Sequence, residues 1–205
     1  MRNSLSDIDC FVNFVSSKYE QVVIVAYCFG CDKILNYLQF GKNSKIASVS
    51  LVAPQDMFET IYGEDGEKAL SQAVKNIKDG HACDIIDKKL FSFCDVSSET
   101  YFDMIINKKF YQFPIFSNEI ITQQDLDLNL PIQLVIGELD RGVGNGKIKY
   151  GADDYLNLIA KKIKTKEKMV IPNTSHSFSQ RPNTTADKIL MFAYETTQLT
   201  RKRGV

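Results

Sequence analysis

The chain lacks several features that mark whole classes of protein. Its 205 residues contain no run of about 18 apolar residues, so the sequence predicts no membrane-spanning helix. Neither sign of charge prevails, because 25 Lys and Arg balance 25 Asp and Glu, and we expect neither nucleic acid nor a membrane surface as a partner. The start, "MRNSLSDIDCF", lacks the regions of a signal peptide, and the 5 cysteines follow no disulfide framework. We therefore expect a cytoplasmic protein.

Two patterns alternate along most of the chain. Short β-branched runs bounded by turn residues are typical of buried parallel strands, and they occupy residues 22–26, 46–53, 131–137 and 168–172. Helical patterns lie at residues 6–19, 31–40, 152–163 and 184–199, and the first of them places on one stripe Ile8, Phe11, Val12, Val15 and Tyr19. This alternation predicts an α/β fold with a mostly parallel sheet and flanking helices.

Residues 55–130 interrupt the alternation. This segment has helical patterns at 67–77, 83–93 and 99–113 and no clear pair of strands. We expect the aromatic side chains of residues 101–113 to fill the core of this segment. The predicted organisation is an α/β core formed by residues 1–54 and 131–205, with a helical lid or cap inserted at residues 55–130.

The stretch "VVIVAYCFGCDKIL", residues 22–35, places Cys28 where a strand ends and a helix begins. In a parallel sheet this junction faces the ligand crevice, because the N–H groups of the following helix point into it. The small residues Ala26 and Gly30 permit a tight turn there. The pattern Ala-x-Cys-x-Gly is a variant of the Gly-x-Ser-x-Gly nucleophile elbow.

Two later segments supply partners for this thiol in a familiar order. The motif "GELD" after strand 131–137 offers Glu138 and Asp140, and "NTSHSF" after strand 168–172 offers His176. Together with the elbow, these motifs resemble those of the α/β-hydrolase superfamily, in particular its dienelactone-hydrolase-like members with a Cys nucleophile. The resemblance covers residues 6–198 as order and motif. It departs from the family in Ala26 and Asn173, where Gly is usual, and in Cys28, where Ser is usual.

The resemblance implies a catalytic triad of Cys28, His176 and Asp140, with Asp140 preferred to Glu138 because the acid loop resembles the family there. It also implies that the backbone N–H of Phe29 binds the oxyanion. The expected activity is acyl hydrolysis of a small-molecule ester, lactone or thioester, with acyl transfer left open and no cofactor or metal. A thiolate is a good leaving group, so activated acyl groups are better substrates than amides.

Three other interpretations remain open. Cys28 and Cys31 form a Cys-x-x-Cys at a strand-to-helix junction, as in thiol redox proteins, although a thioredoxin fold does not need so long a chain. The same two thiols with His81 and Cys83 loosely match zinc-ligand spacing, although His81 is otherwise expected in a turn or helix cap. A hydrolase fold that has lost catalysis would act as a binding or scaffold protein.

The strand at residues 22–26 is expected to lie at an edge of the sheet. Only about 20 residues precede it, enough for one helix, whereas the family places several strands before the nucleophile strand. We therefore expect four parallel strands, the N-terminal strands of the family being absent, and a second copy or an N-terminal partner covering this edge. Catalysis is expected to be weak, since loss of one oxyanion donor costs on the order of 3 kcal/mol.

Overall fold

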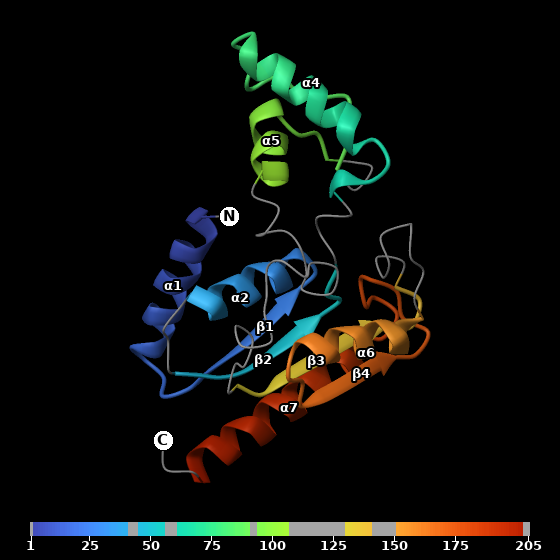
Figure 1. The fold of residues 1–205 in the computed structure, drawn as a ribbon. Coiled ribbons are helices and arrows are strands. Elements are labelled where there is room, and N and C mark those ends of the chain that lie inside the picture. Colours follow the sequence, from blue (N-terminus) through green and yellow to red (C-terminus); the bar gives the residue numbers. More distant parts are fainter. Residues whose placement is uncertain are drawn as a thin grey trace.

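The computed structural model describes residues 2–40, 45–55, 61–90, 94–106, 130–140 and 151–202. Helices and strands alternate along these residues (Figure 1). In chain order the elements are α1 (Arg2–Ser16), β1 (Val22–Tyr27), α2 (Phe29–Phe40), β2 (Ile46–Val52), α4 (Gly66–Lys78), α5 (Ser98–Ile106), β3 (Ile132–Gly137), α6 (Ala152–Lys162), β4 (Glu167–Ile171) and α7 (Pro182–Lys202). The predicted α/β fold is confirmed.

The four strands form one parallel sheet in the order β1-β2-β3-β4. Strands β2 and β3 are buried at every position, which explains why their sequences are continuous apolar runs. Among the described residues, β1 pairs only with β2, so it forms one edge of the sheet as predicted. All four carboxyl ends point the same way, toward one side of the molecule.

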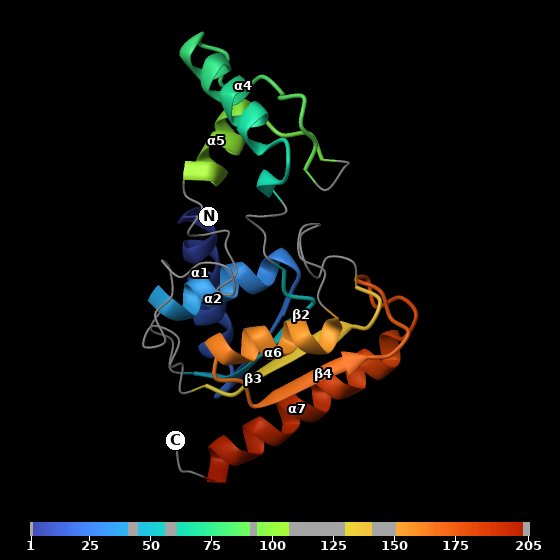
Figure 2. The same ribbon diagram turned by 45° about the vertical axis from the view of Figure 1, so that its right-hand side comes forward.

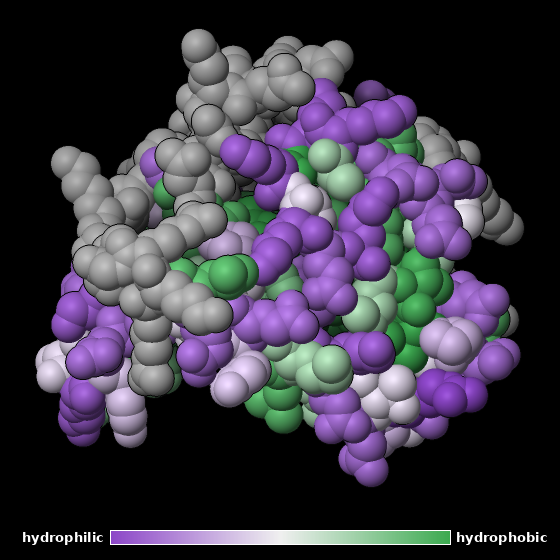
Figure 3. All heavy atoms as spheres, turned by 90° about the horizontal axis from the view of Figure 1, so that it is seen from below, coloured by the Kyte–Doolittle hydropathy of each residue, from purple (hydrophilic) through white to green (hydrophobic). Residues whose placement is uncertain are grey.

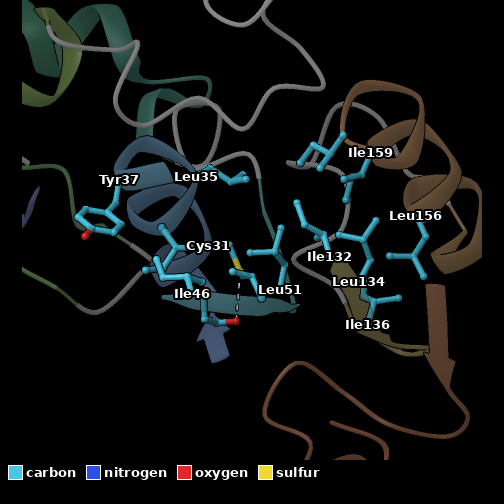
Figure 4. Close-up of a cluster of buried hydrophobic side chains, with 14 of the residues drawn as sticks. Cys31, Leu35, Tyr37, Ile46, Leu51, Ile132, Leu134, Ile136, Leu156 and Ile159 are labelled. Atoms are coloured by element: carbon cyan, nitrogen blue, oxygen red, sulfur yellow. Dashed lines mark hydrogen bonds between the residues drawn. The ribbon is translucent and has the colours of Figure 1, made fainter. Parts of the chain in front are cut away.

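Helices cover both faces of this sheet (Figures 1 and 2). On one face, side chains of α1, α2 and α6 form the main core with the strands, and Figure 4 shows the fully buried Cys31 among them. On the other face α7 packs against the sheet around Val52, Val135 and Ile171. None of the helices described is both long and apolar enough to cross a membrane.

The face under α7 also holds a buried polar network. Thr196 donates a hydrogen bond to Ser48 Oγ over 2.9 Å, and Ser50 donates one to Gln133 Oε1 over 2.8 Å. Ser48, Ser50, Gln133 and Thr196 are all fully buried. Because buried polar groups need such partners, the network fixes where α7 sits on the sheet.

The first helix differs from the prediction at both ends, since α1 spans residues 2–16 and not 6–19. Val12 is buried, but Phe11 is 66% exposed and Tyr19 is 64% exposed. The predicted stripe was therefore too wide. The side chain of Phe11 points about 100° away from that of Val12 around the helix, and Tyr19 lies beyond the helix end.

Helices α4 and α5 pack against each other around a second hydrophobic cluster, in which Tyr101 is fully buried. The helix predicted at residues 83–93 is wrong for residues 83–90, which form isolated antiparallel bridges instead, Ile85 with Ser97 and Leu90 with Cys94. Ile86 and Leu90 are both buried in this cluster, and they lie four residues apart. This spacing is that of one helix face, although the chain between them is not helical. Residues 91–93 and 107–113 of the predicted helices lie outside the described residues.

Candidate active site

The turn between β1 and α2 holds Cys28 in a strained conformation. Its φ is 52°, in the left-handed region that costs energy for a residue with a side chain. The Cys28 N–H donates to the Val52 carbonyl over 2.9 Å, and the Cys28 carbonyl accepts from the Cys31 N–H over 2.9 Å. The turn is therefore fixed by the sheet on one side and by the first turn of α2 on the other.

A loop after β4 carries His176, and it lies directly against the end of β3. A Cβ atom added to Gly137 would meet the Thr174 carbonyl oxygen at 2.3 Å, so only glycine permits this approach. The Thr174 carbonyl accepts a hydrogen bond from the Leu139 N–H over 2.9 Å. The loop that holds the histidine is thus joined to the loop that holds Asp140.

Backbone strain is concentrated in the segments that follow the carboxyl ends of the strands. Among the described residues other than glycine, positive φ angles occur at Cys28, Ala53, Asn173 and Phe178. All four follow the carboxyl ends of β1, β2 and β4. Strain of this kind persists where the surrounding structure holds it, and it is typical of functional sites.

The structure brings His176 and Asp140 together. His176 Nδ1 lies 2.9 Å from Asp140 Oδ2, and the Asp140 side chain is completely buried while that of His176 is 32% exposed. Hydrogen bonds with Asp140 and then with Cys28 raise the pKa of His176 to about 9, against the opposing effect of burial. The histidine therefore contacts both other members of the predicted triad, and its ring is protonated at neutral pH.

Glu138, the alternative acid, makes a different contact. Its Oε2 accepts a hydrogen bond from the Asn173 N–H over 2.7 Å, so it ties the acid loop to the histidine loop. The positive φ of Asn173 turns that N–H toward the carboxylate. Glu138 is thus placed to support the loops, and Asp140 is the acid at the histidine ring.

Two further residues contact His176 that the motifs did not indicate. The Tyr27 hydroxyl donates to the His176 carbonyl oxygen over 2.9 Å, and the two rings lie 5.3 Å apart. The Gln55 amide lies 3.1 Å from His176 Nδ1. Gln55 follows the end of β2, so inspection of the residues after all four strands, and not only after the three with motifs, would have found it.

Cys31 and His81, which the redox and zinc interpretations used, do not contact the histidine ring of the site in the described contacts. Cys31 is fully buried, its thiol donates to the carbonyls of Ala26 and Val52, and burial raises its pKa well above the usual value. It is therefore a poor partner for thiol exchange with Cys28. His81 lies in the exposed turn after α4, as expected. Within the described part of the chain, no three His, Cys, Asp or Glu residues form a metal site.

The residue after Cys28 contacts the cluster formed by α4 and α5. Phe29, which follows Cys28 and begins α2, packs against the hydrophobic cluster of α4 and α5. The Lys33 ammonium lies 5.0 Å from the centre of the Phe29 ring. Phe29 therefore joins the α4–α5 pair to the residue next to Cys28.

Comparison with solved structures finds the same fold in α/β-hydrolases. The chain is similar to hypothetical protein PA2218 from Pseudomonas aeruginosa, with 15% identity over 93% of this chain and 67% of that one and a TM-score of 0.59. It is similar to a carboxylesterase from Nitrososphaera gargenis (12% identity, 96% and 72% coverage, TM-score 0.54). It is also similar to MGS-MChE2, an α/β-hydrolase enzyme from a lagoon-sediment metagenome in Morocco (9% identity, 93% and 68% coverage, TM-score 0.53).

These similarities establish the fold. No protein-family model matches the sequence, and no curated protein matches it either. The chain has the α/β-hydrolase fold, which it shares with carboxylesterases at low sequence identity. A fold hosts many activities, so the function of this chain must be argued from its own site.

Proposed function

We propose that the chain is an acyl hydrolase that acts on an ester, lactone or thioester through Cys28, His176 and Asp140. The observation that carries this proposal is the convergence of the three side chains, with Cys28 in a strained elbow and His176 between the thiol and a buried carboxylate. Nucleophile, base and orienting acid in this order are the elements of a triad. The shared fold of carboxylesterases agrees with it.

In the first half of the reaction, the Cys28 thiolate attacks the acyl carbon while the His176 imidazolium lies beside it. A carbon–sulfur bond forms, and the carbonyl electron pair moves to oxygen, which the Phe29 N–H at the start of α2 stabilises. The intermediate collapses as His176 gives its proton to the departing alkoxide or thiolate. Asp140 holds the ring and stabilises its positive charge throughout.

In the second half, water releases the acyl group. The neutral His176 takes a proton from the water, which attacks the carbon of the acyl thioester, and Cys28 leaves as the thiolate. The products are a carboxylic acid and the regenerated imidazolium. Because the attacking sulfur is itself a good leaving group, substrates with poor leaving groups return to reactants, and thioesters, lactones and activated esters are favoured.

Selective alkylation of Cys28 tests the reacting pair. A trace of iodoacetamide should label Cys28 faster than the exposed Cys10 and Cys83, as mapped by peptide mass spectrometry. His176→Ala should slow the labelling of Cys28 but leave that of Cys10 and Cys83 unchanged. Equal rates at Cys28 in both proteins would show that the thiol is not activated, and would favour a binding protein with a hydrolase fold.

A further inference from the structure

Tyr27, the last residue of β1, joins the nucleophile strand to the histidine loop. Side chains alternate between the two faces of a strand, and Ala26 packs in the core with α2, so the Tyr27 side chain lies on the opposite face of the sheet. On that face its hydroxyl donates to the His176 carbonyl oxygen over 2.9 Å. Its ring meets that of Phe178 edge to face, with the ring centres 6.5 Å apart. One side chain thus connects the end of β1 with the loop after β4.

The two strands that this contact connects are not neighbours in the sheet. The strand order is β1-β2-β3-β4, so at about 4.8 Å per strand the axes of β1 and β4 lie about 14 Å apart. His176 therefore reaches Cys28 because its loop extends back across the ends of the strands between them. Positive φ angles at Asn173 and Phe178 lie on either side of His176, and strain of this kind persists only where surrounding contacts hold it.

Hydrogen bonds hold the histidine loop from two sides. On the acid side, two bonds join residues 138–139 to residues 173–174. On the nucleophile side, the Tyr27 hydroxyl binds the backbone of His176 itself. Partial burial and then the charge of Cys28 raise the pKa of Tyr27, so the hydroxyl keeps its proton at neutral pH and remains a donor to the carbonyl oxygen.

We infer that Tyr27 is a positioning residue, whose hydroxyl holds the backbone of His176 so that the imidazole stays beside Cys28. The inference rests on the proposed function, because it treats Cys28 and His176 as the reacting pair. Tyr27 acts through the histidine and transfers no proton itself. Since Tyr27 and Cys28 are adjacent in the sequence, one strand end fixes both the nucleophile and the loop that carries its base.

Tyr27→Phe tests this role, because it removes the hydroxyl and keeps the ring. We expect the alkylation of Cys28 by a trace of iodoacetamide at pH 7 to slow about fivefold, the usual effect of one hydrogen bond. Tyr37→Phe is the matched control, because the Tyr37 hydroxyl donates to Asp9 Oδ1 over the same 2.9 Å but joins α2 to α1. It should lower the stability to urea and leave the labelling of Cys28 unchanged.

The double variant of Tyr27→Phe with His176→Ala shows whether the hydroxyl acts through the histidine. If it does, His176→Ala alone and the double variant label Cys28 at the same slow rate. Further slowing in the double variant would mean that Tyr27 acts on the elbow itself. No slowing in Tyr27→Phe, or equal slowing in Tyr37→Phe, would mean that the hydroxyl serves stability alone. Each of these results overturns the inference.

Failure of the proposed function gives a different pattern. Labelling of Cys28 that His176→Ala does not slow would refute the reacting pair, and with it both proposals. A protein that shows the expected labelling in all variants but hydrolyses no acyl substrate would refute the hydrolase activity and leave the role of Tyr27 standing.

Discussion

At the scale of single residues, we propose that the site is built for a sulfur nucleophile and not for an oxygen nucleophile. The pKa of His176 beside Cys28 is raised to about 9, so at neutral pH the protonated ring is favoured, and a protonated ring does not act as a base. A thiolate needs no further deprotonation and is stabilised by the adjacent imidazolium. The departure from the usual serine is thus consistent with the charge state of the histidine.

This reasoning predicts how Cys28→Ser depends on pH. The variant should hydrolyse p-nitrophenyl acetate slowly at pH 7, and its rate should rise with pH as His176 loses its proton, with a midpoint below that of the native protein because the contact with Cys28 that helps to raise the His176 pKa is gone. Cys28→Ala should be inactive throughout this range. Initial rates between pH 6 and pH 10 provide the test, and a Cys28→Ser enzyme as active as the native one at pH 7 would contradict the proposed thiolate–imidazolium pair.

His176 should also make the stability of the fold depend on pH. Its pKa rises from 6.5 to about 9 on folding, so its contribution to the free energy of unfolding is complete below about pH 6.5 and is lost as the pH rises through 9. We expect the difference in stability between the native protein and His176→Gln to shrink across this interval. Urea unfolding at pH 6 and pH 9.5 measures it, with His81→Gln as the control; a difference that grows with pH would refute the assignment.

At the scale of elements, the site depends on how closely the loop after β4 approaches the end of β3. We predict that Gly137→Ala moves the histidine loop, because the new Cβ would meet two backbone carbonyl oxygens, of Thr174 at 2.3 Å and of Ser175 at 2.8 Å. Backbone atoms cannot swing aside, so the expected loss of stability is about 1–3 kcal/mol. Hydrolysis should fall further than stability alone explains, because His176 follows Ser175 directly.

Gly30→Ala is the matched control for this prediction. Gly30 also lies beside the site, but a Cβ there would lie 4.0 Å from that of Ala26, an ordinary contact. Its position in the first turn of α2 makes alanine acceptable or slightly stabilising. Thermal unfolding and esterase rates of both variants decide the matter, and equal losses would show that neither glycine is placed as described.

At the scale of the whole molecule, the two edges of the sheet differ in character. The edge strand β4 carries Glu167 and Lys168, whereas β1 reads "VVIVAY" and has no charged residue. On β1, Val25 is 52% exposed and Tyr27 is 46% exposed. Further apolar side chains lie on the outer surface of α7, at Leu190, Met191 and Tyr194, and Figure 3 shows apolar areas among the polar ones on that side of the molecule.

We propose that the β1 edge pairs with a second copy of the chain, since an uncharged, apolar edge strand is a template for strand pairing. Val25→Lys places a charge on this edge at an exposed position, so it should lower self-association without unfolding the protein. Light scattering across a concentration series measures this. Leu190→Lys changes a side chain on α7 that is 65% exposed and lies away from the edge, so it should have little effect. Equal effects of both variants would indicate general surface hydrophobicity instead.

The motifs led to residues that the structure brings together, because each motif lies at the end of a strand. Cys28, Asp140 and His176 could be named from the sequence, since carboxyl ends of parallel strands meet at one side of a sheet. Gln55 and Tyr27 carry no motif, and their contacts with His176 span 121 and 149 residues of sequence. Such distant contacts leave no periodic signal along the chain.

The sequence by itself determined the strands, their order along the chain and the three motifs, because burial on both faces and tight turns impose local composition. Only the tertiary structure decided which face of α1 is buried, that residues 83–90 are not helical, and that Glu138 accepts a hydrogen bond from the histidine loop while Asp140 contacts the histidine ring. It also decided the raised pKa of His176, which depends on Asp140 and Cys28 at the ends of two other strands. These properties arise from packing between distant segments, and packing is a property of the assembled chain.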